Sequence, residues 1–222
     1  MTPPPRPHPA PRDPRPRRGG RPTLEQAARL DGDIREAALR LFLEQGYEST
    51  SMDAIAVAAG TTKASLYARF RGKEAVFSSV LEWAVQRPDW PVPEPPAPDL
   101  DDLEGALTAI ATTAVRRALH PSMVQLGRIA IAHASRFPEI ARGTYGAGFW
   151  PRRQLLVDLL NRHAATGAIV ADDPEMLAEH FLGMVSGAPA RLASYGIVRD
   201  AADQERHTRT AVRLFLRSLR PD

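Results

Sequence analysis

The chain has 222 residues, of which 43% are hydrophobic and 25% are charged, a composition typical of a folded globular protein. It contains no cysteine, which excludes disulfide scaffolds, thiolate nucleophiles and cysteine-rich zinc sites. No apolar run approaches the roughly 18 residues of a membrane span, and the N-terminus lacks the apolar segment of a secretory signal. We therefore expect a cytoplasmic protein without a membrane partner.

The basic charge is concentrated at the N-terminal end of the chain. Residues 1–22 contain six arginines and one aspartate, and residues 61–73 contain four lysines or arginines and no acidic residue. Beyond residue 86, 16 basic residues are balanced by 16 acidic ones. This asymmetry is typical of a protein whose N-terminal end binds nucleic acid.

The first part of the chain is predicted to be an arm followed by helices. Residues 1–22 are rich in proline and arginine, which predicts a disordered basic arm. A helix can begin at Thr23, and from Asp31 apolar residues recur with helical spacing as far as Gly46. Thr50 is expected to cap the next helix. These helices, together with others expected at 51–58, 62–68 and 73–86, form a predicted domain at 23–86.

A proline-rich run separates this domain from the rest of the chain. Six prolines lie within residues 87–99, which prevents a helix from continuing and predicts a linker and a domain boundary. The sequence that follows again has helical patterning without strand-like alternation, so the predicted fold class is all-α. A larger helical domain is expected at 100–222, with helices at 101–119, 122–136, 138–166, 174–195 and 200–219.

Residues 50–73 have the features of a helix-turn-helix. Gly60 permits the positive φ of a tight turn, and Leu66 and Phe70 can anchor the second helix to a core. Thr62 begins that helix with backbone N–H groups suited to a phosphate, and Lys63 on its first turn can reach guanine acceptors. The second helix of such a motif presents its first residues to base edges in the DNA major groove.

Each of these features also has a simpler interpretation. Short helices joined by a glycine occur in any helical protein, and Tyr67 could be a half-buried core residue. The basic residues between 61 and 73 could form a solvated face. The combination of cap, turn, anchors and basic flank favours DNA binding over these alternatives.

Residues 31–86 resemble the N-terminal domain of the TetR family of transcriptional regulators. This resemblance implies a three-helix DNA-binding unit, a fourth helix leading to a regulatory domain, and a homodimer on a near-palindromic double-stranded DNA operator. The residues that carry it are Gly46-Tyr47, Thr50-Ser51, Ile55-Ala56, Ala59-Gly60, Lys63, Leu66-Tyr67, Phe70 and 73–77. The predicted DNA-binding residues are Thr50, Ser51, Thr61, Thr62, Lys63, Ala64, Ser65, Tyr67, Arg69 and Lys73.

The sequence departs from the family pattern on and beside the predicted recognition helix. Thr61 and Thr62 replace the usual valine or isoleucine followed by serine. Ala64 replaces the usual glycine, and Arg69 replaces the usual histidine. Because base edges are read at this part of the motif, the DNA sequence that this chain recognises does not carry over from the family.

Parts of the second domain resemble the C-terminal domain of AefR-like members of the TetR family, in segments 120–140 and 172–185. The resemblance implies a helical effector-binding and dimerisation domain with a cavity for a small, largely apolar molecule. Each apolar candidate has ordinary core packing as its alternative. The candidate ligand-binding residues are Met123, Arg128, His133, Phe137, Tyr145, Phe149, Trp150, His180, Phe181 and Met184.

The last two predicted helices carry residues suited to a dimer interface. Small residues on the first of them allow helices to approach closely, and the final helix carries an apolar stripe. In the family these helices form a four-helix bundle between subunits, and packing within one chain is the alternative. The predicted interface residues are Gly183, Gly187, Ala190, Val212, Phe215, Leu216 and Leu219.

No motif of a common enzyme class or metal site is present in the sequence, so we expect neither an enzyme nor a cofactor. The resemblance implies a sequence-specific transcriptional repressor that a small-molecule effector releases from its operator. An architectural DNA-binding protein without an effector is the alternative, and a small helical enzyme is the least favoured. The architectural alternative gives no reason for a second helical domain.

The basic arm gives a first testable prediction. Its arginines can reach into a minor groove, as the arms of other DNA-binding folds do, whereas the alternative is a solubilising tail. If the arm neutralises phosphates, deletion of residues 1–20 lowers the slope of log affinity against log salt by roughly 0.9 for each phosphate that the arm binds. Operator titrations at several salt concentrations measure this slope, and a slope that deletion leaves unchanged would contradict a role of the arm in phosphate binding.

Overall fold

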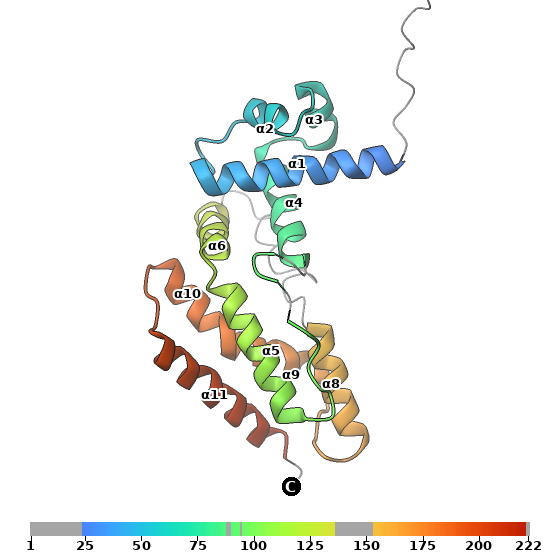
Figure 1. Ribbon diagram of the computed structural model, residues 1–222, viewed down its shortest axis with the longest axis vertical. Helices are drawn as coiled ribbons and strands as arrows, with labels where there is room; N and C mark the ends of the chain where they lie inside the picture. Colours follow the sequence, from blue (N-terminus) through green and yellow to red (C-terminus); the bar gives the residue numbers. More distant parts are fainter. Residues whose placement is uncertain (1–23, 88–89, 94, 136–152, 221–222) are drawn as a thin grey trace, which may run out of the picture.

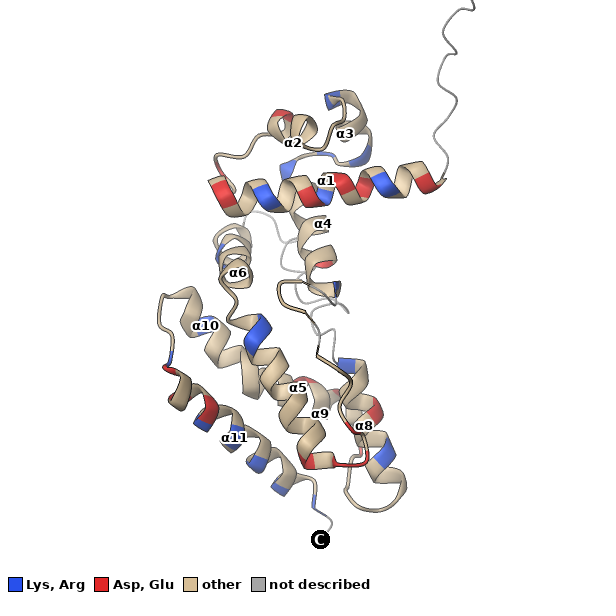
Figure 2. Ribbon diagram, in the orientation of Figure 1, with Lys and Arg blue, Asp and Glu red and all other residues tan. Residues whose placement is uncertain are grey.

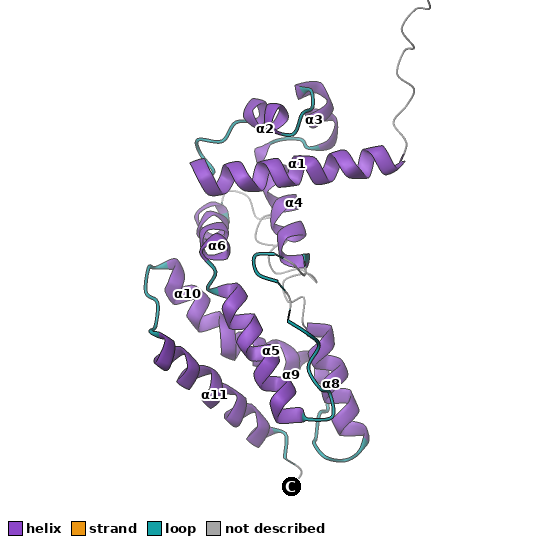
Figure 3. Cartoon of the chain, in the orientation of Figure 1, coloured by secondary structure: helices purple, strands orange, loops and turns teal. Residues whose placement is uncertain are grey.

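A computed structural model describes residues 24–87, 90–93, 95–135 and 153–220, which form helices joined by loops and contain no strand (Figures 1 and 3). This confirms the predicted all-α fold. None of the helices in these ranges combines the length and the apolar character needed to cross a membrane. The first four helices are α1 (Leu24–Gln45), α2 (Met52–Ala58), α3 (Lys63–Arg69) and α4 (Lys73–Gln86).

The second domain contains the remaining elements. In Figure 1, α1 lies across the top with α2 and α3 above it, and α4 leads down towards this domain. The elements are α5 (Leu103–Ala118), α6 (Pro121–His133), α8 (Arg153–Ala165), α9 (Pro174–Leu182), the π-helical turn η1 (Gly183–Gly187), α10 (Ala188–Ser194) and α11 (Ala201–Ser218).

Helix α1 begins before Asp31, the residue from which the sequence shows helical spacing of apolar residues, and is continuous to Gln45. Its inner face buries Ala37, Ala38, Leu41 and Phe42, with the spacing expected of an amphipathic helix. Gly46 ends it with a φ of 81°, the left-handed conformation predicted from the sequence. The predicted cap at 23 lies outside the described residues.

The predicted helix at 174–195 is divided by a wider turn. Helix α9 ends at Leu182, the π-helical turn η1 follows, and α10 begins at Ala188. The predicted helix at 138–166 is described only from Arg153, because residues 136–152 lie outside the described ranges. The periodicity of apolar residues therefore predicts helix over 174–195 but does not reveal the extra residue in the π-helical turn η1.

The first hydrophobic core belongs to α1–α4 and also to α6. Leu126 and Ala130 of α6 are buried together with core residues of the helix-turn-helix, such as Phe42 and Phe77. Beside them, Gln125 Nε2 donates a hydrogen bond of 2.8 Å to the backbone oxygen of Leu43. The core of the predicted domain at 23–86 is therefore completed by a helix from the second domain.

The second hydrophobic core lies between α5, α8, α9 and α11. Phe181 and Phe215 are central to it, with ring centroids 4.7 Å apart. Val212, Phe215 and Leu219 are each less than 5% exposed within the single chain. The apolar stripe predicted for a dimer interface is thus mainly intrachain core, because an amphipathic pattern does not show which chain covers it.

Helix α6 is also bound to α10. Arg128 donates hydrogen bonds from Nε to the backbone oxygen of Ser194 at 2.8 Å and from Nη2 to that of Ala193 at 3.0 Å. A cation at the carboxyl end of a helix satisfies carbonyl groups that have no partner within the helix. Helix α6 therefore contacts the helix-turn-helix on one side and α10 on the other.

The burial of Phe215 gives a second prediction. Phe215→Ala removes a ring from the second core and leaves a cavity, so the free energy of unfolding should fall by about 3–5 kcal/mol. Met176→Ala on α9 is the control, because Met176 is 47% exposed and its removal should change stability by no more than about 0.5 kcal/mol. Urea unfolding of both variants at one protein concentration measures this, and equal stabilities would disprove the intrachain role of Phe215.

Candidate nucleic-acid interface

Helices α2 and α3 are joined by a tight turn that fixes their crossing. Gly60 has a φ of 63°, and the backbone N–H of Thr61 donates to the oxygen of Ala56 at 2.9 Å. Ala56 is 3% exposed, so its small side chain lies where the two helices approach. This turn forms as the sequence predicts, since only glycine adopts a positive φ without strain.

The inner side of α3 is anchored in the first core. Leu66 is completely buried and Phe70 is 9% exposed, and both pack with Ile55 of α2. Thr62 caps α3 by accepting a hydrogen bond of 3.1 Å from the backbone N–H of Ser65. The cap and the apolar anchors hold the short helix in one orientation, because seven residues are too few for a stable isolated helix.

The outer side of α3 remains accessible. Thr62, Lys63 and Ala64 are exposed, Ser65 is half-buried, and Tyr67 is 45% exposed. Four of these predicted DNA-binding residues thus lie on one short helix, and the fifth, Thr62, is its cap. They include the charged, hydroxyl and methyl groups that read base edges and phosphates.

Lys63 forms an ion pair with Asp53 of α2. Its Nζ lies 2.8 Å from one carboxylate oxygen of Asp53 and 3.0 Å from the other. The hydrogen bond and the negative charge of Asp53 raise the pKa of Lys63 above its ordinary value. Both side chains are more than half exposed, so water and salt screen the pair and it contributes little to stability.

Thr50 is buried and does not face solvent. It is 1% exposed, and its hydroxyl donates a hydrogen bond of 2.8 Å to the backbone oxygen of Gly46. Ser51, and not Thr50 as predicted, caps α2 by accepting a hydrogen bond from Ala54 N–H at 3.1 Å. Thr50 therefore closes the loop after α1, whereas Ser51 is exposed beside α2.

Arg69 and Lys73 are held by groups of the protein itself. Arg69 Nε lies 2.7 Å from a carboxylate oxygen of Asp31 on α1. Lys73 Nζ donates to the backbone oxygens of Tyr47 at 2.7 Å and Glu48 at 3.2 Å, and it lies 4.3 Å from the centroid of the Tyr47 ring. Both cations therefore help to hold the motif together, and their predicted contacts with DNA stay predictions.

The predicted effector residues are not brought together by the described part of the second domain. Arg128 binds the end of α10, and His133 packs on Tyr47 with ring centroids 4.3 Å apart. Phe181 is completely buried core and His180 is exposed on α9. Met123 and Met184 are half-buried, and Phe137, Tyr145, Phe149 and Trp150 lie outside the described residues.

An open pocket with a volume of about 440 Å³ lies elsewhere in the second domain. Its lining includes Asp101, Asp102, His163, Leu216 and Arg220, near the start of α5 and the end of α11. It contains no predicted effector residue, and Leu216 faces it although the sequence predicts Leu216 at a dimer interface. The described residues alone therefore do not define an effector cavity.

Charged residues are distributed unevenly over the helices. Figure 2 shows basic residues near α3 and the start of α4, both acidic and basic residues along α1, and mainly basic residues along α11. Sequence patterns did not predict the ion pairs that Asp31 and Asp53 form with two of the basic residues between 61 and 73. The acidic residues of the preceding helices were the available signal, but their pairing depends on tertiary structure.

Comparison with known protein families matches two separate parts of the chain. Residues 34–80 match the family model described as bacterial regulatory proteins, tetR family. Residues 105–220 match the model described as AefR-like transcriptional repressor, C-terminal domain. The chain belongs to the TetR family. This confirms both resemblances, and the chain is a DNA-binding transcriptional regulator of that family.

Individual relatives agree with this assignment. The HTH-type transcriptional regulator AcrR of Shigella flexneri is 42% identical over 62 residues, which span 28% of this chain and only 29% of AcrR. The solved structure of the flavonoid-responsive regulator FrrA is 33% identical, with a TM-score of 0.68 over 87% of this chain and 98% of FrrA. A TetR-family regulator from Mesorhizobium loti is 25% identical, with a TM-score of 0.67 over 88% of this chain and 99% of that structure.

The pair formed by Lys63 and Asp53 gives a third prediction. Asp53→Asn removes a carboxylate from the DNA-facing side and frees Lys63, so affinity for non-operator duplex DNA should rise by up to roughly five-fold at low salt. Glu82→Gln on the exposed side of α4 makes the same change of charge away from α3 and serves as the control. Fluorescence anisotropy at two salt concentrations measures both, and an equal rise in both variants would mean that only net charge matters.

Proposed function

We propose that this TetR-family regulator is a cytoplasmic homodimeric repressor that binds a palindromic operator through α3. A small, largely apolar effector bound to the second domain releases it. The supporting observation is the form of α3, whose inner side is fixed by Leu66 and Phe70 while Lys63 and Tyr67 remain accessible. No enzymatic role is part of this proposal, because the relatives AcrR and FrrA are named as regulators.

Recognition would use the first turns of α3 in a major groove. Lys63 exchanges Asp53 for guanine acceptors or a phosphate, Ala64 packs on a thymine methyl group, and Tyr67 contacts the backbone. Two such helices in a dimer lie about 34–36 Å apart, one turn of DNA, so the operator is a near-palindrome. The two halves of the operator then add their binding energies.

The dimer would form through the exposed sides of η1, α10 and α11. Gly183, Gly187 and Ala190 are half-buried and allow a second helix to approach. Large apolar residues are exposed in this region, which is unfavourable in water and supports coverage by a second copy. They are Tyr195, Ile197, Val198 and Leu214.

Effector binding would be transmitted through α6. This helix contributes Leu126 and Ala130 to the core of the DNA-binding domain and binds α10 through Arg128. An effector that favours another position of α6 changes the spacing of the two α3 helices and weakens DNA binding by the same coupling free energy. The name of the relative FrrA supports an aromatic, flavonoid-like effector class.

The recognition helix gives a fourth prediction. Lys63→Ala combined with Tyr67→Ala should weaken binding to DNA from upstream of the protein's own gene by at least roughly ten-fold, because each interaction with a base or phosphate contributes about 1–3 kcal/mol. Both side chains are exposed, so thermal unfolding should remain close to that of the parent. Gel-shift titration measures the affinity.

Arg162→Ala is the matched control, since Arg162 is an exposed cation on α8 in the second domain. It should leave operator affinity unchanged. If the double variant binds as tightly as the parent, α3 is not the recognition helix.

A further inference from the structure

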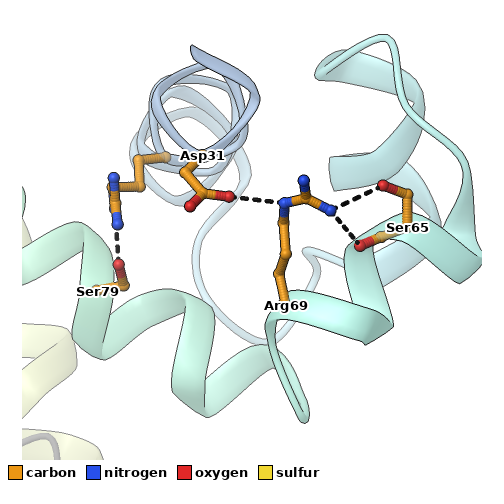
Figure 4. Close-up of polar contacts among 5 residues, drawn as sticks. Asp31, Ser65, Arg69 and Ser79 are labelled. Carbon is orange, nitrogen blue, oxygen red and sulfur yellow. Dashed lines mark hydrogen bonds and ion pairs between the residues drawn. The ribbon is translucent and has the colours of Figure 1, made fainter. Parts of the chain in front are cut away.

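Arg69 lies at the end of the recognition helix and extends back towards its beginning. Its Nη1 donates to Ser65 Oγ at 3.1 Å and to the backbone oxygen of Ser65 at 3.3 Å (Figure 4). On the other side, its Nε donates to Asp31 of α1 at 2.7 Å. One guanidinium group therefore connects α1 with the first turn of α3.

The surroundings of this contact make it well defined. The side chains of Arg69 and Asp31 are 22% and 35% exposed, so water and salt screen the pair less than they screen a fully exposed pair. The guanidinium is planar and holds its donors in a fixed fork, which restricts where Ser65 and Asp31 can lie relative to each other. The charge of Arg69 is balanced by Asp31 and is not offered to DNA.

The contact with Arg69 determines the hydrogen-bonding role of Ser65. A serine hydroxyl has one proton to donate and two lone pairs that accept. Since Arg69 donates to Ser65 Oγ, the hydroxyl proton must point away from the guanidinium. Within the described part of the chain no acceptor for that proton is found, and Ser65 lies on the first turn of the helix that meets DNA.

We propose that Arg69, held by Asp31, is a positioning residue that makes Ser65 a hydrogen-bond donor towards DNA, and that it is not itself a phosphate contact. This inference rests on the proposed role of α3 in recognition. It implies that the base opposite Ser65 presents an acceptor, such as guanine O6 or N7, adenine N7 or thymine O4. An exocyclic amine of cytosine at that position would be less favoured, because it could use only the second lone pair of Ser65 Oγ and would leave the hydroxyl proton without an acceptor.

A merely structural contact between helices is the competing explanation, and the structure contains a matched example. Arg35 of α1 donates from Nε to Ser79 Oγ of α4 at 2.7 Å, also shown in Figure 4. Arg35→Met and Arg69→Met therefore remove the same charge and a similar interhelical contact. Only Arg69 is bound to a residue on the first turn of α3.

The experiment selects binding sites from a pool of random duplexes with the parent chain and with Arg69→Met, Ser65→Ala, the double variant and Arg35→Met. Arg69→Met and Ser65→Ala should relax base preference at the same position of each half-site, by roughly 2- to 12-fold, the range expected for the loss of a single hydrogen bond. The double variant should relax it no further, since the two residues act as a unit. Arg35→Met should keep the preference of the parent.

The salt dependence of binding distinguishes the two roles of Arg69. A positioning residue predicts an unchanged slope for Arg69→Met, whereas a phosphate contact predicts a slope lower by roughly 0.9 per site. Asp31→Ala frees the cation, so its slope should rise by up to roughly 0.9 per site while base preference relaxes. This second variant keeps the inference testable if thermal unfolding shows that Arg69→Met does not fold.

Two results would overturn the inference. One is a lower slope for Arg69→Met with base preference unchanged, and the other is an equal loss of affinity on every sequence with no effect of Ser65→Ala. A parent chain that enriches no sequence from the pool would instead disprove the proposed function itself, and the inference with it. That failure is visible before any substitution is made.

Discussion

The packing of Leu126 and Ala130 of α6 into the core of the helix-turn-helix is the contact on which the rest of the structure depends. It fixes α1 against the second domain, and α1 in turn carries α2 and α3. Gln125 adds a hydrogen bond to the backbone of α1, and His133 packs on Tyr47 at the loop before α2. The position of the recognition helix is therefore set by the second domain as well as by its own motif.

The basic residues that are concentrated near the N-terminal end of the sequence have different roles in the structure. Of the basic residues between 61 and 73, Lys63, Arg69 and Lys73 all have protein partners. Lys63 holds its partner in an exposed and exchangeable pair, whereas the other two are partly buried and tie the motif together. A basic cluster in a sequence thus indicates the class of partner but overstates how many of its cations are available to that partner.

Local features of the sequence predicted the fold, while long-range partners did not follow from it. The glycines at 46 and 60 and the anchors Leu66 and Phe70 act through their immediate neighbours, so spacing alone locates the turn and the recognition helix. The contacts of Thr50 depend on how the loop after α1 closes, and those of Arg69 depend on the position of Asp31 on α1. Most of the stripe on α11 is buried within the single chain, which the sequence could not show, because amphipathicity indicates that a face is covered and not by which chain.

The shared core has a consequence for how such regulators are assembled in evolution. One family model ends at residue 80 and the other begins at residue 105, so the boundary between the two matched regions lies before α6. Buried side chains of α6, which belongs to the second matched region, pack into the core of the first. The regions defined by sequence similarity therefore do not coincide with the units that share a hydrophobic core. An exchange of second domains between regulators would have to bring a compatible α6 surface with it.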